Sequence, residues 1–493
     1  MKTRTNLFLG VMMLVAIFTS CSKEDDTTPV GPVIPTDAVA WTGTSIGDGS
    51  DAFEIKGKYT IKKGVYSLKG WVYIVSGSEL YIEPGTIIKG DKATKATIIV
   101  EPGGKLFAEG TQALPIIMTS AQAPGSRKPG DWGGLVICGK AKNNAGIMTI
   151  EGGLRTQHGG SDDTDNSGVI RYVRIEFAGY PFATDQEING LTMGSVGNGT
   201  KVDHVQVSYS NDDSYEWFGG SVSCKYLIAF RGWDDDFDTD NGFSGKMQFL
   251  LGVRDPKIAD QSVSNGFESD NNASGTATEP YTSAAFSNVT LIGPKGKDAQ
   301  FANTASYVDG GGMNPNNGSR LGLFHSAIQI RRNSHLNIFN SVAVGYPVGL
   351  IVENDKGSAT QTAATNGVLA VQNVVFGGMT ILGSDKNKTW LDQFSSNATT
   401  LDATKVSFSN TYFLRDNGGN SNLPSIADLK LSEINYGPMA GSPLVGKSNL
   451  FTPALLNNAT FDKVDFIGAF RSDSDTDNWT KGWTNFDPQN TVY

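Results

Sequence analysis

The chain has 493 residues and a formal net charge of −10 at pH 7. This acidic balance argues against nucleic-acid binding, because phosphate backbones require a basic surface. Glycine is abundant at 59 residues, which is typical of a chain with many turns, and only 18% of the residues are charged. The four histidines and three cysteines have no zinc-ligand spacing, so we expect neither a zinc site nor an organic cofactor.

Residues 1–20 are predicted to be a signal peptide. Lys2 and Arg4 precede the apolar run "NLFLGVMMLVAIF", which is too short to span a bilayer. "FTSC" resembles a bacterial lipobox, which implies that Cys21 is acylated, although an ordinary cleaved signal followed by a chance cysteine is the alternative. The next five residues resemble the surface-export signal of Bacteroidota lipoproteins: Ser22, Lys23, Glu24, Asp25 and Asp26. These resemblances imply a lipid anchor in the outer membrane and an extracellular location.

A Pro-rich tether completes residues 21–39, and a repeat follows it. Glu83-Pro84-Gly85 recurs 18 residues later at residues 101–103. Apolar residues continue the same step, from Tyr81 through Ile99 and Ile117 to Leu135. Short β-branched runs that end in Pro-Gly or Gly-Gly are typical of strands closed by turns, and one strand at a fixed interval indicates a β-solenoid.

The coil length favours a right-handed parallel β-helix over a left-handed one. A left-handed hexapeptide helix needs an apolar residue every six positions, but Thr94 and Gln112 break that pattern. Farther on, Val205, Leu227 and Phe249 step by 22 residues. We therefore predict an all-β fold with an N-terminal cap over residues 40–80, the β-helix over 81–422, and C-terminal coils and a cap over 423–493.

Several motifs resemble one protein family. They are "IEPGTIIKG", "SAQAPGSRKPGDWGGLVICGKA", "WDDDFDTDNGFSGKMQF", "NGFESDNNASG" and "DNWTKGWTNFDP". They are similar to a family of Bacteroidota surface β-helix proteins in the pectate-lyase-like superfamily. The resemblance covers nearly all of the mature chain and implies the fold and the location. It implies no activity.

Two acidic stretches, "NDDSYEW" and "WDDDFDTD", stand 22 residues apart. This step would stack their carboxylates at roughly 4.8 Å on adjacent coils. A calcium ion would offset the repulsion between them, whereas the alternative is a hydrated acidic rim. The candidate metal ligands are Asp212, Asp213, Asp234, Asp235, Asp236, Asp238 and Asp240. "ESDNN", which begins at Glu268, is expected to be a polar loop.

Three functions are compatible with this surface. Tyr209, Tyr215, Trp217 and Trp233 flank the acidic residues and could stack on sugar rings, which favours an adhesion or binding module for a glycan or for a protein of a host or cell surface. A polysaccharide lyase or a glycoside hydrolase is the alternative, although Arg231 and Arg254 are expected to form salt bridges with the carboxylates. The third is an accessory lipoprotein of an outer-membrane transporter.

Cys138 and Cys224 could be buried thiols or a disulfide.

Overall fold

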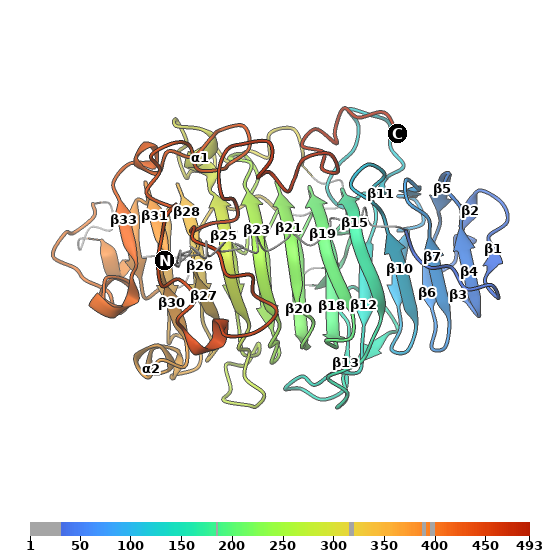
Figure 1. Ribbon diagram of the computed structural model, residues 1–493, viewed down its shortest axis with the longest axis horizontal. Helices are drawn as coiled ribbons and strands as arrows, with labels where there is room; N and C mark the ends of the chain where they lie inside the picture. The colour runs from blue at the N-terminus through green and yellow to red at the C-terminus, as the bar shows by residue number, and fades with distance from the viewer. Residues whose placement is uncertain (1–30, 184–185, 315–319, 387–390, 395–399) are drawn as a thin grey trace, which may run out of the picture.

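The computed structural model describes residues 31–183, 186–314, 320–386, 391–394 and 400–493. The predicted signal peptide, Cys21 and the export signal therefore lie outside the described residues. The described chain winds into a right-handed parallel β-helix whose coils are stacked along the long axis of the molecule (Figure 1). The predicted fold class is confirmed.

Each coil places one strand in sheet B, which forms one side of the β-helix. In hydrogen-bonded order, the strands of sheet B in the described residues are β3 (Phe53–Ile55), β6 (Trp71–Ile74), β9 (Thr97–Val100), β12 (Gly134–Cys138), β18 (Leu191–Val196), β20 (Tyr215–Gly220), β22 (Phe237–Asp240), β24 (Phe267–Ser269), β26 (Ser326–Ile330), β29 (Val348–Val352) and β32 (Ile381–Ser384).

Sheet A forms the other two sides. In chain order its strands are β1 (Val39–Ala40), β2 (Ser45–Ile46), β4 (Lys58–Ile61), β5 (Val65–Leu68), β7 (Glu79–Ile82), β8 (Ile87–Gly90), β10 (Lys105–Glu109), β11 (Ile116–Ser120), β15 (Gly168–Glu176), β19 (Lys201–Ser208), β21 (Cys224–Phe230), β23 (Lys246–Val253), β25 (Ala285–Ile292), β27 (Asn337–Phe339), β28 (Val342–Val344), β30 (Ala370–Gln372), β31 (Val375–Gly377) and β33 (Ser421–Leu423).

The long strands of sheet A bend at one residue with left-handed backbone geometry, and this bend makes two sides from one sheet. Tyr172, His204, Tyr226 and Phe249 have φ angles of 48°, 52°, 57° and 62°, and they interrupt the pairing registers of β15, β19, β21 and β23. Such angles are unfavourable for non-glycine residues. Stacking of the four rings, with neighbouring centroids 4.3, 4.4 and 5.2 Å apart, compensates.

The remaining elements lie in the connections. Two antiparallel hairpins pair β13 (Met148–Thr149) with β14 (Gln157–His158) and β16 (Pro181–Ala183) with β17 (Gln186–Glu187). The helices are α1 (Pro294–Lys297), α2 (Thr360–Thr365) and α3 (Phe408–Phe413), and the 3-10 turns are η1 (Leu391–Gln393), η2 (Asp416–Gly418), η3 (Ile426–Leu429) and η4 (Ala454–Leu456).

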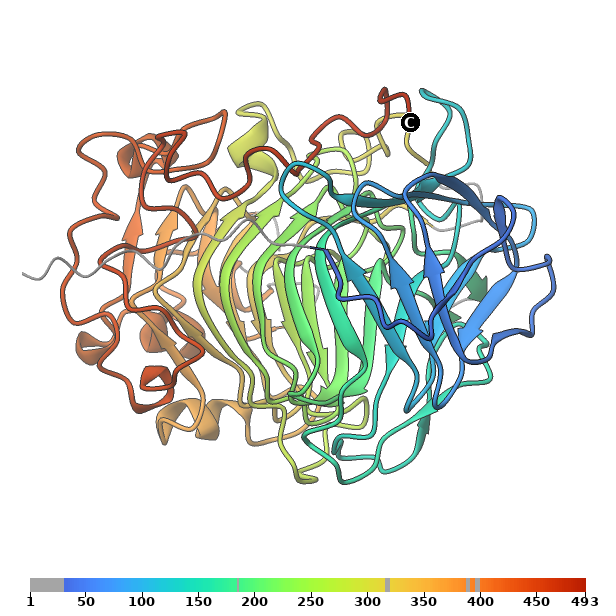
Figure 2. The ribbon, with the colours of Figure 1, turned by 45° about the vertical axis from the view of Figure 1, so that its right-hand side comes forward.

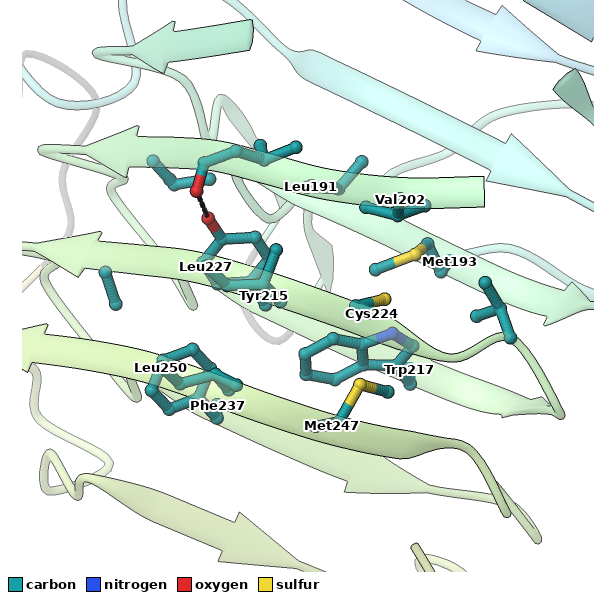
Figure 3. Close-up of a cluster of buried hydrophobic side chains, with 14 of the residues drawn as sticks. Leu191, Met193, Val202, Tyr215, Trp217, Cys224, Leu227, Phe237, Met247 and Leu250 are labelled. Atoms are coloured by element: carbon teal, nitrogen blue, oxygen red, sulfur yellow. Dashed lines mark hydrogen bonds between the residues drawn. The ribbon is translucent and has the colours of Figure 1, made fainter. Parts of the chain in front are cut away.

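The core lies inside the coils, where alternate side chains of both sheets meet. Figure 3 shows Tyr215 and Trp217 of β20 packed among aliphatic residues such as Leu227 and Leu250 of sheet A. The Tyr215 hydroxyl donates to the carbonyl of Val205 at 2.7 Å, so this buried polar atom is satisfied.

The predicted 18-residue register is wrong, although the solenoid that it indicated is present. Ile99 pairs with Tyr73 and Val136 in sheet B, whereas Ile117 pairs with Ile87 in sheet A. The repeated Glu-Pro-Gly motif marks two different corners of the coil. The first copy joins β7 to β8 within sheet A, and the second joins β9 of sheet B to β10 of sheet A.

The boundaries of the β-helix also differ from the prediction. Coils begin within residues 40–80, because β3 already pairs with β6 and β4 with β7. The C-terminal residues do more than cover the last coil. From Phe466, which contacts Asn288, the chain runs back along the outside of sheet A to Tyr493, whose hydroxyl lies 2.6 Å from Glu176. Figures 1 and 2 show this C-terminal strap, residues 466–493, in red.

Candidate metal centre on sheet B

The outer face of sheet B carries a row of carboxylates on three adjacent strands. In β20, Tyr215 and Trp217 point into the core, so Glu216 between them faces outward. The strand register places Glu216 beside Asp238 of β22, and Asp238 beside Glu268 of β24. The prediction that Glu268 lies in a polar loop is therefore wrong, because strand alternation puts it in this row.

A second group of carboxylates lies just before these strands. The backbone N–H of Asp235 donates to Oδ1 of Asp213 at 2.8 Å, and the N–H of Ser214 donates to the carbonyl of Asp235 at 2.9 Å. These bonds stack Asp213 on Asp235, which confirms the 22-residue step in this region. The same step places Tyr215 opposite Phe237 and Val205 opposite Leu227. Its predicted continuation to Phe249 is wrong, because Leu227 pairs with Leu250.

Two groups of three carboxylates approach closely enough to share a cation. Asp212, Asp213 and Asp234 each offer an oxygen within 4.8 Å of the others, and so do Asp213, Glu216 and Asp238. Asp213 belongs to both groups, and it is mostly buried at 7% exposure. We call these five residues the acidic cluster.

Burial and mutual repulsion disfavour the ionised state of these carboxyls. Loss of hydration is the first cause that raises the pKa values of Asp213, Glu216, Asp234 and Asp238 well above their ordinary range, and neighbouring carboxylates are the second. A bound divalent cation would reverse both effects. The pKa of Asp235 is raised in the same way.

Oxygen atoms around the acidic cluster are short of hydrogen-bond donors. Among the described residues, Oδ1 of Asp234 and of Asp238 are buried and accept no hydrogen bond. The same holds for Oγ1 of Thr192, which pairs with Glu216 across the strands, and for Oδ1 of Asn189, whose amide nitrogen donates to Glu216 at 2.5 Å. Buried oxygens without partners are unusual in proteins, and a hard cation would satisfy them.

Asp235, Asp236 and Asp240 do not belong to the acidic cluster, in contrast to the prediction. Asp236 points inward, where it pairs with the buried Arg254 at 2.9 Å and with the Tyr346 hydroxyl at 3.3 Å. Asp240 lies outward at the other end of β22, beside Asp270. The expected salt bridge between Arg254 and these carboxylates is confirmed, whereas Arg231 pairs instead with Asp255 at 3.4 Å.

The aromatic residues predicted to bind a ligand are buried. Tyr215, Trp217 and Trp233 are 0% exposed and Tyr209 is 5% exposed. Tyr215 and Trp217 fill the core, whereas Tyr209 and Trp233 pack against the C-terminal residues. The prediction that these rings form a platform for sugars is therefore wrong.

The outer face of sheet B differs on the two sides of the acidic cluster. Toward the N-terminal coils, Ile150 and Leu154 of a long connection cover Ile99, Val136 and other outward side chains of sheet B. Toward the C-terminal coils, two arginines bring positive charge to this face. Arg331 binds Asp270 at 2.9 Å and also contacts Glu268, and Arg332 binds Asp270 at 2.7 Å.

Cys138 and Cys224 are both free and buried. Cys138 lies under the cover of sheet B, and Cys224 lies in the core of the β-helix. The interpretation as buried thiols is confirmed, and burial raises the pKa values of both thiols.

These features define a class of protein, a parallel β-helix with charged residues on the outer face of one sheet. A family model for the pectate-lyase-like beta helix domain matches residues 54–422, and the chain belongs to this family. No curated protein and no solved structure matches the chain significantly. Within the described residues, the helices are all too short or too polar to cross a membrane.

Proposed function

We propose that this protein is a lipid-anchored outer-membrane protein that faces outward and binds an extracellular glycan through a calcium ion. The ion would be held by Asp213, Glu216 and Asp238. The supporting observation is the approach of their oxygens within 4.8 Å, together with the buried oxygens nearby that have no hydrogen-bond partner.

The chemistry of the donor atoms favours calcium. Calcium takes six to eight oxygen ligands in flexible geometry, and the three carboxylates can supply several of them. Asn189 and Thr192 offer neutral oxygens beside Glu216. The remaining positions would be available to water or to the hydroxyl and carboxylate oxygens of a glycan. The cation thus joins an acidic protein face to a ligand that the face alone would repel.

The arrangement of the arginines argues for binding rather than for a lyase reaction. A lyase needs a basic group that can lose its proton beside the substrate. Arg331 and Arg332 lie on this side of the molecule, but both are engaged by Asp270, and carboxylates raise the pKa of Arg331 well above its ordinary value. The Arg331 guanidinium therefore stays protonated.

Glycoside hydrolysis is a second candidate, because it needs a carboxylic acid that remains protonated near neutral pH. The raised pKa values of Glu216 and Asp238 provide that property. Product analysis distinguishes the two functions. Binding predicts retention of intact glycan, whereas hydrolysis predicts new reducing ends.

The test is a glycan array probed in millimolar calcium and in chelator. The variant Asp213→Asn/Glu216→Gln should lose the calcium-dependent signal. The control Asp473→Asn/Asp475→Asn changes two exposed carboxylates of the strap and should retain it. Binding that is equal in chelator, or that persists in the first variant, would contradict the proposal.

A further inference from the structure

A pocket lies on a different side of the molecule from the acidic cluster, outside sheet A. It is enclosed by α1, by the ends of β25 and β28, and by residues that follow η3. Its volume is about 440 Å³, which is within the range of small-molecule sites. In Figure 1, α1 lies near the upper ends of these strands and close to the C-terminal part of the chain.

Three lysines line this pocket: Lys295, Lys297 and Lys430. Within the part of the chain that the structure describes, none of the three forms an ion pair. Glu433 is the one acidic residue among the described residues of the lining. The pocket therefore carries a net positive charge on a protein whose formal charge is −10.

Lys297 is the most constrained of the three. Its ammonium group lies 3.4 Å from the Tyr436 hydroxyl and 5.1 Å from the centre of that ring. Partial burial and the nearby charge of Arg231 lower its pKa. An anion bound beside Lys297 would offset its electrostatic repulsion with the neighbouring cations.

Apolar side chains also line the same pocket. Ile292 and Val344, the last residues of their strands, are 4% and 1% exposed, and Met439 is 40% exposed at the rim. Ile426 and Leu431 complete the apolar part. A lining that combines lysines with apolar side chains fits a ligand that has both a charged and an apolar part.

We propose that this pocket binds a small organic anion, such as an aryl or alkyl carboxylate, sulfonate or phosphate. Its charged group lies among Lys295, Lys297 and Lys430, and its apolar body lies on Ile292, Val344 and Leu431. This inference is independent of the cation site on sheet B and does not require the proposed glycan.

The experiment uses the full chain and isothermal titration with three probes: 1-naphthalenesulfonate, the neutral 1-naphthalenemethanol, and inorganic phosphate. The sulfonate should bind at least tenfold more tightly than either of the others. Equal binding of the neutral probe would overturn the role of the lysines. Equal binding of phosphate would overturn the role of the apolar lining.

Two variants locate the binding. Lys295→Gln/Lys430→Gln should weaken sulfonate binding at least tenfold, and Met439→Ser should weaken it by a smaller factor. The control Lys447→Gln/Lys463→Gln removes the same charge from exposed positions elsewhere and should bind like the wild type. Circular dichroism confirms that the variants are folded. Unchanged affinity in the first variant would refute the site.

Discussion

Calcium should stabilise this protein, and the size of the effect should depend on pH. Asp213 is the residue to change, because it belongs to both groups of close carboxylates. Asp213→Asn keeps an oxygen that can accept the hydrogen bond from the Asp235 backbone N–H but removes the charge. The assay is thermal melting of wild type and variant in millimolar calcium and in chelator.

The expected magnitude follows from linkage. A ligand that binds only the folded state adds RT ln(1 + [L]/Kd), or about 2.7 kcal/mol at a hundredfold excess over Kd. The unfolding entropy is about 2.1 cal/mol/K per residue, so for a chain of this size the shift should be roughly 3 °C. Asp213→Asn should abolish this shift.

The direction of the pH effect follows from the raised pKa values of Asp213, Glu216 and Asp238. The folded state holds these protons more tightly than the unfolded state does. Stability in chelator is therefore greatest below the unfolded pKa near 4 and falls as pH rises toward the folded values. Calcium should offset that loss at neutral pH.

Asp213→Asn should therefore be more stable than wild type in chelator at pH 8 and less stable than wild type in calcium. The control Asp475→Asn should melt like wild type in both buffers. Equal melting of wild type with and without calcium at pH 8 would show that the acidic cluster is only a hydrated rim.

Four further predictions test other parts of the molecule. Ile99→Asp places a charge under the cover of sheet B and should lower the free energy of unfolding by more than about 3 kcal/mol in denaturant melts. Gln206→Ala removes two hydrogen bonds to Asn485 and should speed proteolysis of the C-terminal strap, whereas Gln261→Ala, at an exposed position, should not. Burial raises the pKa of Glu353 to about 7 from 4.5, so Glu353→Gln should gain up to about 3 kcal/mol at pH 8 and nothing at pH 4. Cys21→Ser should remove the protein from outer-membrane fractions, and its retention there would contradict lipidation.

The sequence was sufficient to predict the solenoid because β-branched runs closed by glycine turns recur along it. It was insufficient for the register of the N-terminal coils. Corresponding residues in sheet B, Val72, Ile98 and Leu135, are separated by 26 and then by 37 residues. Each coil contains several similar turns, so a repeated turn motif does not identify which corner it occupies.

The candidate site was predicted only in part, because similar residues occupy different positions relative to the sheet. The 22-residue step placed Asp213 beside Asp235, but charge alone did not separate inward from outward carboxylates. Alternation along "YEWF" would have done so, because Glu216 stands between Tyr215 and Trp217, and two bulky rings at alternate positions indicate the buried side of a strand. The same alternation identifies Glu268 after Phe267.

The row of outward carboxylates on sheet B is positioned by strand pairing and hardly depends on the length of the connections. Glu216 and Asp238 are 22 residues apart and Asp238 and Glu268 are 30 apart, yet all three occupy one row. The extra residues of the longer coil leave the sheet before β24 and do not disturb the register. A change of loop length should therefore leave these three side chains in place while altering the loops around them. Asp213, the third proposed cation ligand, precedes β20 and accepts a hydrogen bond from the Asp235 backbone N–H. The proposed cation site therefore depends both on the outward residues of sheet B and on the short segments that lead into its strands.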